Sequence, residues 1–367
     1  MTRTEIGLGF QSDKRPADYA RLASKAEEYG FDVLSVFGDL MYQPPIFPLL
    51  EMARATHRVR IGAACWNPYS QHPYEIAGQV AALDLASSGR AYLGLARGSW
   101  LGDVGLSQPR PLAHLRDAAG LIRTLLSGSP DGFQGEVFQL TPGTRLAYET
   151  FRPRIPLLIG TWGARTAALA GRIAQEVKIG GTANPAMVEV MRGRISAGVS
   201  DPDSADHSAG AGQPGIVVGA VTVVDEDGPL ARSRARTEVA MYLAVVAELD
   251  PTIDVPGDLL ARVKDLLARG RASEAGALIP DDLLDLFAFS GTPEQIAAQA
   301  QRLIDAGASR VEFGTPHGLN DDRGVDLLGT RVLPLLDTEP EPEPEPELRN
   351  DATPLHPPQA SAAAKHC

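Results

Sequence analysis

Five short segments carry side chains that could hold a polar ligand, and each segment follows an apolar run. The carboxylate of Asp39 can accept a hydrogen bond, and the amide of Asn67 offers both a donor and an acceptor. A helix N-cap for Asp39 and a loop cap for Asn67 are the structural alternatives. The segments are residues 36–39, 64–68, 96–100, 160–163 and 180–184.

The last two segments also suit a phosphate group, because their glycines let the backbone approach a ligand closely. Helices expected to begin near Ala164 and Pro185 would offer free backbone N–H groups to an anion. Tight turns without a ligand are the alternative. Tryptophans at positions 66, 100 and 162 lie in the same segments, so we expect a broad, aromatic substrate pocket, with ordinary packing as the alternative.

Apolar, β-branched runs alternate with helical segments of period 3.6 along the chain, a pattern typical of a parallel sheet covered by helices. Eight strand-helix units in order favour a (β/α)8 TIM barrel over a doubly wound sheet. In such a barrel the active site lies at the carboxyl ends of the strands, where the five segments fall. The expected strands are 5–10, 32–37, 59–64, 91–96, 155–160, 176–180, 216–224 and 309–313.

The predicted barrel domain spans residues 1–336, with insertions at about 128–154 and 228–290. The first reads as a hairpin of strands 133–140 and 145–149, and the second as helices over 230–249, 256–269 and 281–287. The first helix should begin near Pro16 and end at Gly30. We expect the loop 201–215 to be mobile and the acidic, proline-rich tail 337–367 to be disordered.

Composition and motifs exclude several classes of protein. A net charge of -12 without any basic run argues against nucleic-acid binding. Cys65 and Cys367 provide neither a disulfide framework nor metal-ligand spacing, so no metal site is predicted, and a cytoplasmic location is expected. No signal peptide or long apolar stretch is found. The glycine-rich string 210–215 precedes a strand, unlike a dinucleotide site. A cofactor must therefore supply the chemistry.

Several segments resemble the luciferase-like oxidoreductases, and among them the 5,10-methylenetetrahydromethanopterin reductases. The resemblance covers residues 4 to about 336 and is carried by residues 83–98, 67–69, 291–294 and 313–318. It implies the deazaflavin coenzyme F420, whose single phosphodiester suits the glycine-rich strand ends. It also implies hydride transfer between the coenzyme C5 and a C=N or C=C bond of a small-molecule or biosynthetic substrate.

The same resemblance implies roles for individual residues. Asp39 would lie beside the coenzyme ring, and a non-prolyl cis peptide at Ala64–Cys65 would make Cys65 a backing residue. Gly9 and Ser99 stand where the family has acids. The implied catalytic residues are Asp39 and Ser99. The implied cofactor-binding residues are Asp39, Ala64, Cys65, Trp66, Asn67, Arg97, Gly98, Gly160, Thr161, Gly180, Gly181 and Thr182. The implied substrate pocket consists of Phe10, Trp100, Trp162 and His317.

Two other functions stay open at this point. The same barrel could serve a two-component monooxygenase that uses reduced FMN and oxygen. It could also be a flavin-binding barrel without turnover, an alternative motivated by Gly9 and Ser99. We expect a small-molecule or peptide substrate, no nucleic-acid or membrane partner, and a homo-oligomer, either dimer or tetramer. Asp84 and Arg90 are interpreted as a structural pair.

Overall fold

The computed structural model describes residues 3–199 and 213–339. Most of the predicted mobile loop 201–215, and the predicted tail beyond residue 339, therefore lie outside the described residues. Within the described ranges, no helix is both long enough and apolar enough to cross a membrane.

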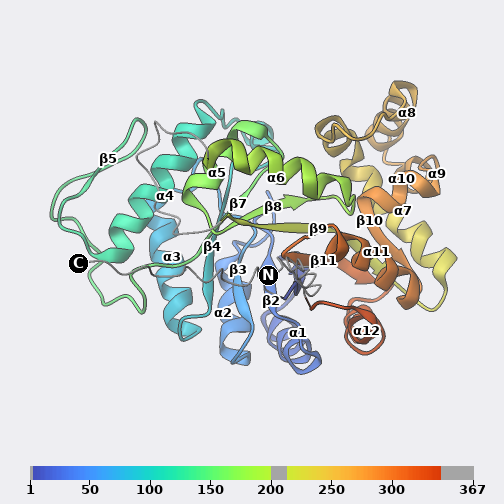
Figure 1. The fold of residues 1–367 in the computed structure, drawn as a ribbon, viewed down its shortest axis with the longest axis horizontal. Helices are drawn as coiled ribbons and strands as arrows, with labels where there is room; N and C mark the ends of the chain where they lie inside the picture. The colour runs from blue at the N-terminus through green and yellow to red at the C-terminus, as the bar shows by residue number, and fades with distance from the viewer. Residues whose placement is uncertain (1–2, 200–212, 340–367) are drawn as a thin grey trace, which may run out of the picture.

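Parallel strands form a closed barrel surrounded by helices (Figure 1). β9 pairs with both β8 and β11, and β11 pairs with β1, which closes the ring. The predicted (β/α)8 fold is confirmed. The barrel strands are β1 (Glu5–Phe10), β2 (Val33–Val36), β3 (Arg60–Ala63), β4 (Ala91–Ala96), β7 (Leu157–Gly160), β8 (Glu176–Gly180), β9 (Gly215–Val224) and β11 (Arg310–Gly318).

Two strands of the large sheet differ markedly from the prediction. β11 continues to Gly318 rather than ending at residue 313, with a register shift after Gly314. A further strand, β10 (Ala288–Gly291), pairs with the second half of β9, beyond the part that pairs with β8. β10 was not predicted because helix α10 (Asp281–Phe287) ends directly before it, so that helix and strand form one apolar run in the sequence.

Helix boundaries follow local signals in the sequence. α1 begins at Pro16 as predicted, and Gly30 ends it in the left-handed conformation (φ 94°), a geometry that glycine adopts without strain. The helices that cover the barrel are α1 (Pro16–Tyr29), α2 (Ile46–Ala55), α3 (Pro73–Ala86), α4 (Pro111–Ser127), α5 (Ala164–Ile173), α6 (Ala186–Val199), α11 (Pro293–Asp305) and α12 (Asp321–Leu327).

The predicted hairpin between α4 and β7 is wrong in its pairing. Strands β5 (Phe133–Gln134) and β6 (Gln139–Leu140) pair with each other, so the turn lies inside the segment expected to be one strand. The Gly135 N–H donates to the Phe138 carbonyl at 2.9 Å and closes that turn. The segment 145–149, expected as the second strand, contains no strand.

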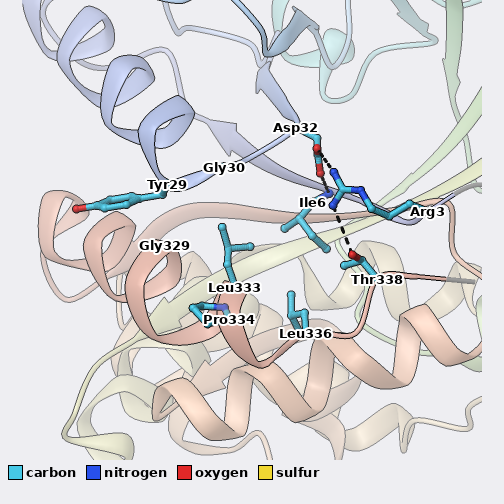
Figure 2. A pocket seen from close by; sticks show the side chains of 10 residues that line it. All are labelled: Arg3, Ile6, Tyr29, Gly30, Asp32, Gly329, Leu333, Pro334, Leu336 and Thr338. Carbon is cyan, nitrogen blue, oxygen red and sulfur yellow. Dashed lines mark hydrogen bonds and ion pairs between the residues drawn. The ribbon is translucent and has the colours of Figure 1, made fainter.

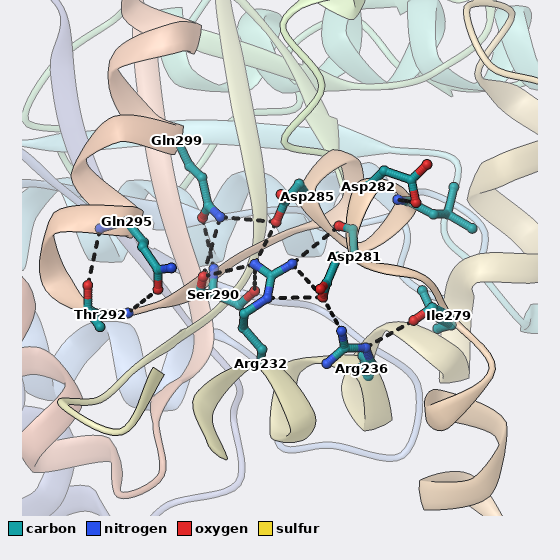
Figure 3. Close-up of polar contacts among 11 residues, drawn as sticks. Arg232, Arg236, Ile279, Asp281, Asp282, Asp285, Ser290, Thr292, Gln295 and Gln299 are labelled. Carbon is teal, nitrogen blue, oxygen red and sulfur yellow. Dashed lines mark hydrogen bonds and ion pairs between the residues drawn. The ribbon is translucent and has the colours of Figure 1, made fainter. Parts of the chain in front are cut away.

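The second insertion is helical, and it packs on one side of the barrel (Figure 1). Within the insertion, Arg232 donates to Asp281 at 2.8 Å and to Asp285 at 2.7 Å (Figure 3). Gln299 of α11 bonds to Asp285 and to both backbone groups of Ser290. Its helices are α7 (Gly228–Val246), α8 (Gly257–Ala268), the unpredicted α9 (Ala272–Ala277), and α10 (Asp281–Phe287), which has the predicted bounds.

The barrel lumen contains a buried polar network. Ser35 of β2 donates to Glu312 of β11 at 2.6 Å, and Lys178 of β8 forms an ion pair with the same carboxylate. These strands are not neighbours in the sheet, so the contacts cross the lumen. Glycines of β1 make room for these side chains, because a Cβ at Gly7 would lie 3.5 Å from the Glu312 Cγ. The lumen therefore holds charged groups that are almost completely buried.

Candidate active site

In several strands, the residues exposed to solvent are those at the carboxyl end. Strand interiors are buried, whereas the residues at and just after the ends are half-buried or exposed. All of them lie on one face of the barrel because the strands are parallel. We call this the carboxyl-terminal face. It includes Phe37, Gly38, Asp39, Ala64, Cys65, Ala96, Arg97, Gly98, Ser99, Trp100, Gly160, Thr161, Trp162, Gly180 and Gly181.

Cys65 lies where β3 reaches this face. The predicted cis peptide at Ala64–Cys65 is confirmed. The thiol points into the barrel, because a Cβ at Gly160 would lie 3.0 Å from Sγ and one at Gly94 would lie 3.4 Å from it. Burial raises the pKa of the thiol to about 12, despite the opposing charge of Lys178. At neutral pH Cys65 is therefore a thiol, and it is a poor nucleophile.

Asn67 and Gly98 form the next part of the face. The Asn67 Oδ1 accepts hydrogen bonds from the Ser70 backbone at 2.9 Å, the Ser70 hydroxyl at 3.0 Å and the Tyr69 backbone at 3.2 Å. Its oxygen thus caps a loop, as in the structural alternative. Gly98 (φ 83°) packs directly on this side chain, because a Cβ there would lie 3.0 Å from the Asn67 Cγ. Any ligand contact by Asn67 must use its amide nitrogen.

Asp39 follows β2 and is open to solvent at the face. Protein atoms nevertheless surround much of the carboxyl group. This desolvation raises its pKa, although a hydrogen bond with Gln11 and the charge of Lys178 oppose the change. A carboxyl group with a raised pKa is better able to donate or accept a proton near neutral pH than an ordinary aspartate.

The loop after β4 presents Arg97, Ser99 and Trp100 to solvent. Trp100 is 50% exposed and has a positive φ of 57°, an unfavourable conformation for a bulky side chain. Gln108 holds the base of the loop by donating to the Arg97 and Gly98 carbonyls at 2.6 and 3.1 Å. The loop therefore holds an aromatic ring at the face.

The end of β7 leads into a helix with a free N-terminus. The Thr161 hydroxyl accepts from the Gly163 N–H at 3.0 Å, and no side chain caps α5. Residues 163–165 are exposed, so the first-turn N–H groups of α5 are accessible to an anion. Trp162 lies beside them, and its Nε1 donates to the Gly180 carbonyl at 2.9 Å.

The structure contradicts the expected phosphate site after β8. The N–H groups of Gly181 and Thr182 both donate to the Gly219 carbonyl, at 2.7 and 3.2 Å. The Thr182 hydroxyl is buried and donates to the Leu286 carbonyl. Asn184 caps the first turn of α6 by accepting from the Ala186 N–H at 3.0 Å. The Thr182 hydroxyl therefore attaches the strand end to the helical insertion, the two N–H groups attach it to β9, and none of the three is available to a ligand.

Three other expected site residues are buried in the protein. The Trp66 side chain is 2% exposed and turns away from the face, donating to Gln79 of α3 at 3.0 Å. Phe10 and His317 are fully buried and form an edge-on ring pair with centroids 5.0 Å apart. None of the three therefore lines an open pocket. The sequence shows that they follow or end strands but not which way they point.

Protonation of His317 is expected to destabilise the protein in acid. Burial lowers the pKa of the ring to about 4 from 6.5, with Asp321 opposing and Lys14 reinforcing the change. The unfolded state binds the proton first, so stability falls as the pH drops from 6.5 to 4, by about 3 kcal/mol in total. Urea unfolding at several pH values should show a smaller acid loss for His317→Asn. Equal losses in both proteins would contradict this role.

The Lys178–Glu312 pair was missed by the sequence analysis, although both residues lie in predicted strands. The sequence nevertheless contains a pattern that indicates it. Each of the two strands carries charged residues two positions apart, namely Glu176 and Lys178 in one and Arg310 and Glu312 in the other. Side chains at that spacing share one face of a strand. In a barrel strand covered by helices, a charged face must point into the lumen.

No group of three or more His, Cys, Asp or Glu side chains that could hold a metal ion occurs among residues 3–199 and 213–339. A pocket of about 280 Å³ lies elsewhere, at the amino-terminal ends of β1 and β2 (Figure 2). It is lined by Arg3, Ile6, Asp32 and residues of the carboxyl-terminal helical turns. That end of a barrel generally serves stability rather than chemistry.

A closed barrel with one accessible set of carboxyl strand ends has the form of a TIM-barrel enzyme. The family model described as Luciferase-like monooxygenase matches residues 1–310, and the chain belongs to this family.

Relatives and solved structures agree with this membership. The chain is 27% identical over 343 residues to a 5,10-methylenetetrahydromethanopterin reductase of Archaeoglobus fulgidus, covering 90% of this chain and 99% of the relative. It is 26% identical over 355 residues to an F420-dependent glucose-6-phosphate dehydrogenase of Nakamurella multipartita, covering 92% and 98%. The F420-dependent tetrahydromethanopterin reductase structure from Methanopyrus kandleri has the same fold, with TM-score 0.79, 21% identity and coverage of 92% and 100%.

Proposed function

We propose that this protein is an F420-dependent oxidoreductase that transfers a hydride between the coenzyme and a C=N or C=C bond of a small-molecule substrate. The observation that carries the proposal is the arrangement at the carboxyl-terminal face. There Asp39, the Ala64–Cys65 segment and the accessible N-terminus of α5 lie at the ends of β2, β3 and β7. The F420-dependent relatives support the choice of coenzyme.

The residues of the face fit a planar ring with a phosphate-bearing side chain. Ala64, Cys65 and Gly160 have small side chains, and Gly98 lies where a Cβ would press on Asn67. A flat ring could therefore lie close to the backbone at the ends of β3 and β7. The first-turn N–H groups of α5 would take the phosphodiester, because an anion at a helix N-terminus meets both free donors and the helix dipole. F420, when bound, supplies hydride transfer at its C5 carbon.

The protein's own side chains have separate tasks at this face. Asp39 would hold a proton on its carboxyl oxygen or accept one, next to the ring edge. Trp100 and Trp162 would cover the substrate and exclude water, since both are large aromatics at the face. Gly9 and Ser99 stand where the resemblance implies acids, and Asp39 supplies a carboxyl group among the residues that define this face.

Asp39→Asn is expected to weaken F420 binding about tenfold, equivalent to about 1.4 kcal/mol, while leaving the fold intact. An exposed carboxylate just after a strand contributes little to the core, so unfolding should be unchanged. Equilibrium titration of F420 by fluorescence would measure the affinity. Glu28→Gln, which removes an exposed carboxylate from the outer surface of α1, is the control. Unchanged F420 affinity in Asp39→Asn would mean that Asp39 does not contact the coenzyme.

Parallel titrations of the wild-type protein with F420 and FMN test the coenzyme assignment itself. We expect F420 to bind and, once reduced, to reduce an acceptor without oxygen. Preference for FMN, with oxygen consumption after its reduction, would instead support the monooxygenase alternative. Binding of a coenzyme without turnover with any donor or acceptor would support the non-catalytic barrel.

A further inference from the structure

A buried ion pair lies in the lumen directly beneath the carboxyl-terminal face. Lys178 and Glu312 have side chains that are only 7% and 1% exposed, and they come from β8 and β11. Burying two charges is costly unless they are paired and hydrogen-bonded. Here Ser35 donates to the second carboxylate oxygen of Glu312 at 2.6 Å, and the Ser35 and Tyr92 hydroxyls are 2.7 Å apart.

The pair has a direction, with its positive end toward the face. The Lys178 ammonium lies 5.3 Å from the centroid of the Phe37 ring, which stands at the end of β2. The charge of Lys178 opposes the raised pKa of both Asp39 and Cys65, and at Cys65 this effect is larger than the opposite effect of Glu312. Burial tends to raise the pKa of Glu312, but Lys178 and Arg310 outweigh burial and lower it, so Glu312 is a carboxylate.

Other ionisable groups lie around the ammonium on several sides. On the face itself the cation is Arg97, which lies exposed on the loop after β4. Arg310, the other nearby cation, stacks over Tyr92 at 5.3 Å deeper in the lumen and lies 3.6 Å from Glu176. The surrounding groups are Glu312 and Arg310 on β11, Glu176 on β8, Tyr92 on β4, Cys65 after β3 and Asp39 after β2.

We propose that Lys178 is an electrostatic positioning residue, whose ammonium favours the anionic form of the coenzyme ring bound at the carboxyl-terminal face. This inference rests on the proposed function. A deazaflavin ring carries a hydroxyl that ionises to an oxyanion and a proton, and a nearby cation in a poorly hydrated setting stabilises the oxyanion. Glu312 and Ser35 hold the ammonium in place from below, so the positive charge is fixed before the coenzyme arrives.

The test is a pH titration of protein-bound F420, followed by its visible absorption. In Lys178→Met the midpoint for ring ionisation should rise by about one pH unit relative to the wild type, the usual effect of removing a close opposite charge. In Glu312→Gln, which keeps the shape but removes the counter-charge, the midpoint should fall. The double variant Lys178→Met/Glu312→Gln should lie between the wild type and Lys178→Met.

A purely structural pair predicts a different outcome. The double variant would then recover stability, and all four proteins would share one midpoint, which would overturn the inference while leaving the proposed function intact. If Lys178→Met does not fold, Glu312→Gln still tests the sign, and a midpoint equal to or above the wild-type value overturns the inference. If FMN binds instead of F420, the ionisation of its reduced ring is titrated in the same way. Failure of the wild type to bind either coenzyme overturns both proposals.

Discussion

Gly38→Ala is expected to lower coenzyme affinity by a factor of at least about ten, or about 1.4 kcal/mol. A Cβ at position 38 would overlap with the carbonyl oxygen of Cys65, a backbone atom that cannot move independently. The methyl group would therefore displace the end of β3, where we place the coenzyme ring. Gly38 lies after the last residue of β2, so most of the barrel should be unaffected.

The affinity should be measured by titration with F420, and thermal unfolding should be recorded in parallel. Gly102→Ala is the matched control, because it lies in the loop after β4 and a Cβ there meets nothing within 4 Å. It should bind coenzyme like the wild type. If Gly38→Ala also binds normally, the end of β3 is not part of the coenzyme site.

Arg152→Ala is expected to reduce the free energy of unfolding by about 3 kcal/mol or more. Arg152 binds Asp84 through two nitrogens, at 2.5 and 3.0 Å, and also donates to the Ala91 carbonyl at 2.8 Å. The Asp84 side chain is only 1% exposed, so removal of the arginine leaves a buried carboxylate without its cation. This is the largest stability effect we predict.

Urea unfolding would measure that loss. Arg145→Ala, which removes an exposed arginine from the same connection, should change stability little. Adding Asp84→Asn to Arg152→Ala should recover part of the loss, because the uncompensated charge is then gone. A loss below about 0.5 kcal/mol in Arg152→Ala would mean that water enters and solvates Asp84.

For the predicted structural pair of Asp84 and Arg90, the spacing in the sequence indicates the structural role but not the partner. Both residues are structural, but they do not pair with each other. Arg90 donates instead to backbone carbonyls, among them Val59 at 2.7 Å and Thr56 at 2.8 Å, while Asp84 pairs with Arg152. The partner of a buried charge comes from a segment distant in sequence, and no local pattern identifies it.

The order of the barrel strands was predictable because buried parallel strands read as separate apolar runs between helices. Side-chain direction at the strand ends was not. Trp66 lies beyond the end of β3 and His317 lies at a register shift of β11, so the regular alternation of a strand predicts the direction of neither side chain. Thr182 and Gly181 looked like ligand groups, but an insertion folded far along the chain uses Thr182, and a neighbouring strand takes both of their N–H groups.

The pairing of β10 with β9 bears on how such barrels diverge. The helical insertion leaves the sheet after Val224 and returns through β10, and the Asp225 N–H donates to the Gly291 carbonyl at 3.1 Å. Its two ends are thus adjacent on one sheet edge. During evolution, or by design, this whole unit could be exchanged for another of different size without changing the barrel connectivity. The unit contacts the end of β8 through Thr182 and Leu286. Such an exchange would therefore change the surroundings of the candidate active site at the end of β8 in one step.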